Sequence, residues 1–211
     1  MTLEAIWEMR EENIYPRLFG HKSRGIFPLE HETFHRFGVV QIDPIWLHHG
    51  IIEFNPTEDR PSWLYVTSGH SNPYDDNSDF CDESVEFALA VTEPGDWAIR
   101  CLQSIMAFDK LLRVNHFPGK PPLDLYDRIP LHEPLNGDEK CILRRLMVTE
   151  TAAYPGFDTP AGHVAIRSLT AITDTEWFFA KDGEKEAGVL VERLERSGHH
   201  PINDPWRASL L

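Results

Sequence analysis

Apolar residues recur at helical spacing in the N-terminal segment, at Leu3, Ile6, Met9 and Ile14. This spacing is typical of an amphipathic helix that buries one face. Pro16 cannot donate the backbone hydrogen bond that a helix interior requires. The pattern therefore predicts a helix over residues 2–15.

Extended segments follow this helix. The pattern of residues predicts β structure over 37–54, interrupted at Asp43-Pro44 and at Gly50. It predicts another strand over 63–67. The clearest strand is Val85–Thr92, which alternates between a face of large apolar residues (Val85, Phe87, Leu89 and Val91) and a face that is mostly small (Glu86, Ala88, Ala90 and Thr92). Because small side chains leave room, we expect another element to pack against the second face.

A helix is expected directly after this strand. Pro94-Gly95 breaks the strand, and Asp96 is placed to act as the N-cap. The apolar stripe of the helix is Trp97, Cys101, Ile105, Phe108 and Leu112. The strand and this helix should form the centre of the fold, and the Pro-, Gly- and Asp-rich residues 114–139 should form a long surface loop with a short strand.

The C-terminal part predicts two more strands and two helices. The strands are expected at 142–148 and 164–172, and Thr173 and Glu176 form a capping box at a helix start. A last helix carries Ala187, Leu190, Val191 and Leu194 and ends at Gly198. No repeat and no linker divides the 211 residues, so we predict a single α+β domain, 1–211, with a mixed sheet flanked by helices.

Composition narrows the function classes. A formal net charge of −14 disfavours binding to nucleic acid and to anionic membrane surfaces, and it favours binding to basic partners. The sequence has no signal peptide and no run of apolar residues long enough to span a membrane. Its three cysteines form no C-x-x-C motif. We therefore expect a cytoplasmic protein without a cofactor; the sequence leaves its oligomeric state open.

An ordered set of short motifs resembles one known family. WLYVTSGHSNP at 63–73 contains a Tyr-x-Thr-x-Gly-x-Ser segment, and a strand beginning at Glu86, then Pro94 and Trp97, follow it. Thr159-Pro160-Ala161-Gly162 and Thr173-Asp174-Thr175-Glu176 come later in the same order. Over roughly residues 40–195 this order is similar to that of bacterial suppressor of fused domain proteins, a resemblance that implies an α+β fold.

The resemblance also implies a function. In the animal proteins this domain helps to clamp an extended peptide as an added strand, and bacterial members look like immunity proteins encoded beside toxins. We expect no second, C-terminal domain in this chain, and therefore strand addition or docking at a sheet edge rather than a clamp between domains. The implied protein is a non-enzymatic binding module that neutralises a basic toxin domain.

Candidate partner-binding residues lie in and after the Tyr-x-Thr-x-Gly-x-Ser segment. They are Tyr65, Thr67, Ser68, His70, Ser71, Asn72, Asp75 and Asp76. Their polar groups could contact a partner, or they could equally hold the loop in shape.

The competing hypothesis is a small zinc hydrolase. His31-Glu32-Thr33-Phe34-His35 is an H-E-x-x-H motif, which on a helix places two imidazoles on one face with Glu32 as general base. The third histidine of the longer motif is replaced by Gln41, so Asp43 or Glu53 would have to complete the site. A solvated helix is the simpler interpretation, and we predict no metal.

Other polar patterns favour structural roles. Asp75 to Asp79 with Glu86 imitates a calcium loop, but Phe80 replaces its glycine. Ser68, His70 and Ser71 lack the G-x-S-x-G elbow of a nucleophile. The pairs His48-His49 and His199-His200 are expected at the surface, and Trp63, Trp97 and Trp177 in the core.

Overall fold

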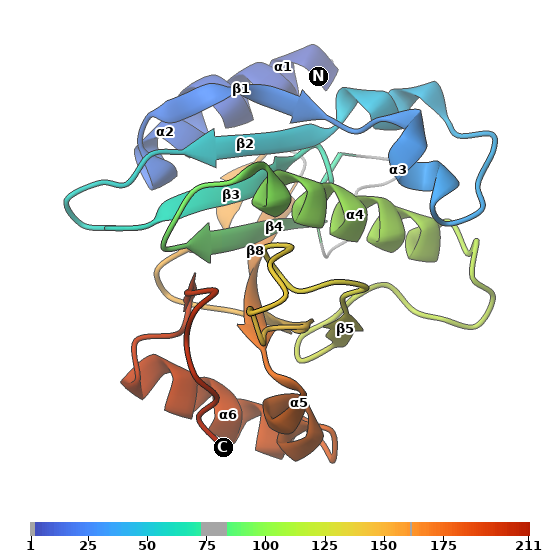
Figure 1. The fold of residues 1–211 in the computed structure, drawn as a ribbon. Coiled ribbons are helices and arrows are strands. Elements are labelled where there is room, and N and C mark those ends of the chain that lie inside the picture. Colours follow the sequence, from blue (N-terminus) through green and yellow to red (C-terminus); the bar gives the residue numbers. More distant parts are fainter. Residues whose placement is uncertain (1–2, 73–83, 161) are drawn as a thin grey trace.

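The computed structural model describes residues 3–72, 84–160 and 162–211, and it has the predicted α+β architecture (Figure 1). In the described residues nine strands form one sheet: β1 (Lys22–Pro28), β2 (Gly50–Phe54), β3 (Trp63–Ser68), β4 (Ser84–Val91), β5 (Arg128–Pro130), β6 (Arg145–Thr149), β7 (Phe157–Thr159), β8 (Gly162–Ile172) and β9 (Ile202–Asn203). The helices are α1 (Leu3–Glu8), the π-helix η1 (Met9–Ile14), α2 (Tyr15–Phe19), α3 (His31–His35), the 3₁₀-helix η2 (Pro44–His48), α4 (Asp96–Arg113), α5 (Asp174–Ala180) and α6 (Glu184–Arg196).

The sheet is mixed, as predicted. Its strand order is β1-β2-β3-β4-β8-β6-β5, with β7 paired to β8 and β9 paired to β4. The pairs β4–β8 and β4–β9 are parallel and the others are antiparallel. β1 and β5 are the two ends of this order, and the short strands β7 and β9 each have a single partner strand as well.

Helices cover both faces of the sheet. On one face, α4 packs against the large residues of β4, including Phe87 and Leu89. On the other face, Tyr15 and Phe19 of α2 share a core cluster with Ala88 and Ala90 of β4, which confirms that an element packs on the small-residue face. A third cluster joins α5 and α6 to β6 and β8. No helix of the described chain is long and apolar enough to cross a membrane.

Two predictions near the N-terminus were wrong. The first helical segment does not stop at Pro16 but continues through α2 to Phe19. The chain forms the wider π-helix η1 just before the proline, so Pro16 does not interrupt a regular series of α-helical hydrogen bonds. Residues 37–49 are not β structure, since Asp43 caps η2 by accepting from the Ile45 N–H. The strand β1 was missed because its burial is irregular.

Other predicted boundaries hold to within a few residues. Thr173 and Glu176 form the capping box of α5, and α6 ends at Arg196, shortly before Gly198. Gly95 rather than Asp96 is the N-cap of α4. The buried face of α4 is rotated from the predicted stripe. Of that stripe Ile105 and Leu112 are buried, but Trp97, Cys101 and Phe108 are only half-buried. The buried face instead includes Ala98, Leu102, Met106 and Asp109.

Candidate functional site

The Tyr-x-Thr-x-Gly-x-Ser segment ends in a tight turn built around a buried carboxylate. Glu86 of β4 is 0% exposed and accepts hydrogen bonds from the turn that follows β3. The donors are the backbone N–H groups of Gly69, His70 and Ser71, at 3.1, 3.3 and 3.0 Å, and the hydroxyls of Thr67 and Ser71. A carboxylate that accepts this many bonds fixes the path of the chain from Thr67 to Ser71.

Arg10 ties the N-terminal helical segment to the same turn. Its guanidinium is buried and donates to Ser68 Oγ at 3.1 Å and to Asn72 Oδ1 at 2.9 Å. Arg10 Nη1 also lies 3.7 Å from Glu86 Oε1. The Tyr15 hydroxyl donates to the Thr67 carbonyl at 2.7 Å. The turn and the N-terminal helices are therefore one polar unit inside the protein.

A second buried pair anchors the other side of the turn. His70 Nε2 lies 2.7 Å from Asp109 Oδ2 of α4, and Asp109 also accepts from Arg113 Nε at 2.7 Å and from the Leu123 N–H at 2.6 Å. Burial lowers the pKa of His70 below its usual value, although Asp109 opposes this. Burial raises the pKa of Asp109, but the hydrogen bond from His70 and the charge of Arg113 outweigh it and lower that pKa to about 2.

Gly69 is required where the turn meets His49. Its φ is +102°, and a Cβ there would lie 2.5 Å from His49 Cδ2. His49 is 2% exposed, and neither ring nitrogen has a hydrogen-bond partner within the described residues. Burial lowers the pKa of His49, so the imidazole is neutral at pH 7.

The structure brings together most of the predicted partner-binding residues, but it turns them inward. Thr67, Ser68, His70 and Asn72 are buried in the network and Ser71 is half-buried. Tyr65 is buried elsewhere, where its hydroxyl accepts from the Gly95 N–H. Asp75 and Asp76 lie outside the described residues. The geometry supports the role of holding the loop; direct contact with a partner stays a prediction.

Sequence reasoning did not anticipate that Asp109, Arg10 and His49 are buried around this turn. Asp109 falls on the buried face of α4 with Leu102 and Ile105, so a charged residue at that helical position was a readable signal. Arg10 lies in a segment of mixed charge, and His49 beside another histidine, where nothing in the local pattern marks burial.

The reactive constellations considered from the sequence are not assembled. The Ser68 hydroxyl donates to Glu11 and the Ser71 hydroxyl to Glu86, while His70 faces Asp109, so neither serine has His70 as its base. Glu86, the last acidic position of the calcium-like pattern, is used by the turn. The rest of that pattern lies in 73–83, outside the described residues.

The H-E-x-x-H segment forms α3 at the surface. His31, Glu32 and His35 are exposed, with the two imidazole rings 6.4 Å apart, while Thr33 and Phe34 are buried. The proposed third ligands have other partners: Asp43 caps η2, and Glu53 accepts from Ser23 and Arg24. Among the described residues no three His, Cys, Asp or Glu side chains come together to hold a metal.

The paired histidines and the tryptophans have mixed outcomes. His48 is exposed on η2, but His49 and His200 are buried, so their predicted surface placement was wrong. Trp63 and Trp97 pack against the main core and Trp177 against the C-terminal cluster, as predicted. Trp177 also has the Arg145 guanidinium 4.3 Å from its ring centroid.

One edge of the sheet is uncovered. β1 pairs only with β2, and Arg24, Gly25 and Ile26 are exposed. Ile26 is 41% exposed, which makes it one of the large apolar side chains on the surface. The opposite edge, β5, has three residues and ends in Pro130, which cannot donate a ladder hydrogen bond. β1 therefore offers the longer open edge among the described strands.

The comparisons with known proteins decide the family. A family model described as suppressor of fused protein matches residues 46–208, which is more than half of the chain. The chain belongs to the suppressor of fused family. This confirms the resemblance inferred from the ordered motifs, which lie largely within the matched region. No curated protein matches the sequence.

Solved structures of suppressor of fused proteins share the fold. A homologue from Neisseria gonorrhoeae has a TM-score of 0.62 at 15% identity, covering 99% of this chain and 98% of that one. A structure described as the Sufu–Fu complex has a TM-score of 0.60 at 17% identity, covering 85% and 88%. Drosophila Suppressor of Fused has a TM-score of 0.58 at 18% identity; the match covers 76% of this chain and 42% of the fly protein.

Proposed function

We propose that this suppressor of fused protein is a non-enzymatic module that binds another protein at the edge of its sheet. The observation that carries the proposal is the uncovered strand β1, which presents backbone and apolar side chains at the surface. Family membership supports a protein partner, since one similar structure is described as a Sufu–Fu complex.

The partner that fits best is a basic protein, and we propose a cognate toxin domain that the chain neutralises as an immunity protein. The net charge of −14 accelerates and stabilises encounter with a positively charged surface. Of the described cysteines, Cys101 and Cys141 are free, which suits a reducing cytoplasm. Masking a basic active surface is a sufficient mechanism of inhibition, because it needs no chemistry from this chain.

The test is co-expression with the protein encoded by the neighbouring gene, followed by titration of the two purified proteins. We expect the chain to rescue growth and to form a tight complex whose affinity falls as salt rises. A neighbouring protein that is not toxic, or a toxic one that the chain neither binds nor neutralises, would contradict the immunity function. Conversion of that protein by catalytic amounts of this chain would contradict the non-enzymatic role.

A further inference from the structure

We infer that a pocket on β8 binds a small zwitterion of dipeptide size, with a free ammonium group, a free carboxylate and an apolar side chain. The pocket lies between β8, the segment 150–156 that follows β6, and the C-terminal end of α6. The strands β2, β3 and β4 separate β8 from β1, so this site is distinct from the edge proposed for the protein partner. The volume of the pocket and the opposite charges in its lining point to this class of ligand.

The pocket is large enough for a small organic molecule. It has a volume of about 490 Å³. Small-molecule sites typically occupy roughly 300–1,000 Å³, so a dipeptide fits within it. Tyr154 and Ile166 are buried in its lining, whereas Glu150, His163 and Glu195 are exposed. A bound molecule would therefore contact apolar surface on its inner side and charged groups near solvent.

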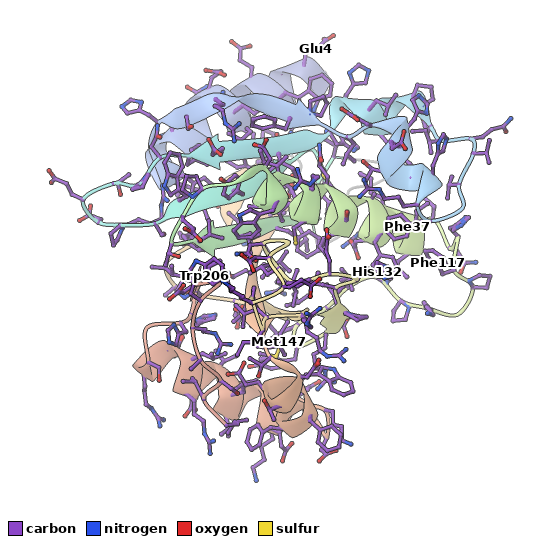
Figure 2. The ribbon with its side chains drawn as sticks, viewed as in Figure 1. Glu4, Phe37, Phe117, His132, Met147 and Trp206 are labelled. Carbon is purple, nitrogen blue, oxygen red and sulfur yellow. The ribbon has the colours of Figure 1, made fainter. Side chains whose placement is uncertain are left out.

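Two core clusters on one face of the sheet position the walls of the pocket. Ile166 of β8 packs in the cluster under the N-terminal helices, and Met147 of β6 packs with Leu194 of α6. Met147 pairs with Thr170, which points to the same side of β8 as Ile166, and Figure 2 shows Met147 above the C-terminal helices. Glu195 follows Leu194, so the packing of α6 brings the Glu195 carboxylate to the pocket.

Gly156 allows the segment 150–156 to lie close against β8. A Cβ at this position would lie 2.5 Å from His163 Nε2 and 2.5 Å from the Val164 carbonyl oxygen. The backbone of a packed strand cannot move aside as the end of a flexible side chain can, so a larger residue would push the segment away from β8. The glycine therefore fixes one wall of the pocket.

Arg167 supplies a positive charge in the lining. Its side chain is 24% exposed, and Nη1 donates to Glu150 Oε2 at 2.9 Å. Among the described residues this is the one hydrogen bond of the guanidinium, which has five N–H donors in a planar fork. The nearby His163 is paired, with Nδ1 2.8 Å from Asp158 Oδ1. The other N–H groups of Arg167 can therefore bind a carboxylate with two parallel hydrogen bonds.

Glu195 supplies a negative charge that a buried histidine supports. Glu195 Oε1 lies 3.3 Å from His200 Nδ1, and His200 Nε2 lies 3.2 Å from the buried Thr149 hydroxyl. Burial lowers the pKa of His200, although the charge of Glu195 opposes this, so the imidazole is neutral at pH 7. The ring therefore positions the Glu195 side chain without cancelling its charge. The exposed carboxylate can accept a hydrogen bond from an ammonium group.

A zwitterion satisfies this set of charges better than a simple ion does. A lone anion at Arg167 would lie beside the Glu150 carboxylate, which repels it, and a lone cation at Glu150 would lie beside the Arg167 guanidinium. A molecule with both groups can direct its carboxylate to Arg167 and its ammonium group to Glu195. Its side chain would contact the apolar part of the lining, which includes Tyr154, Pro155 and Ile166.

The experiment titrates the isotope-labelled chain with the dipeptide alanyl-leucine and follows backbone amides by nuclear magnetic resonance. We expect saturable shifts centred on residues 150–156, 163–167 and 195. Two matched probes each lack one charge: N-acetyl-alanyl-leucine has no ammonium group, and alanyl-leucine amide has no carboxylate. Each should bind about tenfold more weakly than alanyl-leucine, because one charge-assisted contact is lost.

Variants assign each charge to its residue. Arg167→Gln should weaken binding of alanyl-leucine about tenfold and leave binding of the amide probe, which has no carboxylate, unchanged. Glu195→Gln should weaken binding of alanyl-leucine about fivefold and leave binding of the N-acetyl probe unchanged. The matched controls are Arg196→Gln and Glu192→Gln, which should change nothing because these residues pair with each other outside the lining. Circular dichroism of each variant checks that the fold is retained.

Four results would overturn the site or its chemistry. Absence of saturable shifts up to about 10 mM alanyl-leucine would exclude this class of ligand. Equal binding of the three probes would show that the charges do not recognise the ligand, and shifts centred elsewhere in the sheet would exclude the pocket. Unchanged selectivity among the probes in folded Arg167→Gln or Glu195→Gln protein would overturn the role of that residue. The proposed binding of a protein at β1 is independent of each of these outcomes.

Discussion

Replacing Glu86 by glutamine tests whether the buried network holds the turn after β3. The Glu86 carboxylate accepts five hydrogen bonds, three from backbone N–H groups and two from hydroxyls. A carboxamide keeps the size of the side chain, but it has one acceptor oxygen and points an NH₂ group at some of these donors. It also removes the negative charge 3.7 Å from the buried Arg10 guanidinium.

The expected loss follows from these contacts. At least two donors lose their acceptor, at about 1–3 kcal/mol each, and Arg10 keeps a buried charge with weaker compensation. We therefore expect Glu86→Gln to lower the free energy of unfolding by about 3–5 kcal/mol. For a chain of 211 residues this corresponds to a fall in Tm of about 10 °C.

The assay is urea unfolding followed by circular dichroism and tryptophan fluorescence. Glu150→Gln is the matched control, because Glu150 is exposed and its ion pair with Arg167 at 2.9 Å should contribute less than about 1 kcal/mol. A Glu86→Gln protein whose midpoint and slope equal those of Glu150→Gln would refute the reasoning, since the carboxylate would then not be holding the turn.

Three further predictions follow from the same region and from α3. Burial lowers the pKa values of His49 and His70, so the unfolded chain binds protons near pH 6.5 that the folded chain does not. The free energy of unfolding should therefore fall as the pH falls from about 7 to about 5. A urea midpoint that stays constant over that range would contradict this prediction. Gly69→Ala should cost more than about 2 kcal/mol because strain and the His49 ring act together, whereas Gly119→Ala, with φ +77° and open space, should cost about 1 kcal/mol in the same unfolding assay. Chelation with EDTA or the change His31→Ala should leave Tm unchanged, and stoichiometric zinc in metal analysis that is lost on His31→Ala would show that α3 holds a metal.

The centre of the fold could be predicted because local and long-range signals agree there. The alternation from Val85 to Thr92 corresponds to β4, and the small face of that strand did receive a packed element, α2. The capping box at Thr173 and Glu176 needs only local hydrogen bonds, so its sequence signature was sufficient.

The N-terminal region was harder because tertiary context overrides its local pattern. Pro16 is a helix breaker by sequence, but the π-helix before it changes the hydrogen-bond register, and the aromatic cluster of Tyr15 and Phe19 packs the continuing turn. Edge strand β1 mixes Lys22, Arg24 and Gly25 with apolar residues, so it has no clean period of two.

The candidate site was likewise predictable from the sequence only in part. Motif order drew attention to Thr67–Asn72 as candidate contact residues, but it could not show that most of their polar groups turn inward. That outcome depends on Arg10 and Asp109, which lie far away in sequence and reach the turn only in the folded chain. The open edge at Ile26 likewise depends on strand order, which no local pattern specifies.

The most direct test is a comparison of backbone amide exchange, by mass spectrometry, between the free chain and its complex with the cognate partner. We predict that protection increases most in β1, at residues 22–28, and in the adjoining N-terminal helical segment. Increased protection at β5 or along α6, with residues 22–28 unchanged, would contradict binding at this edge.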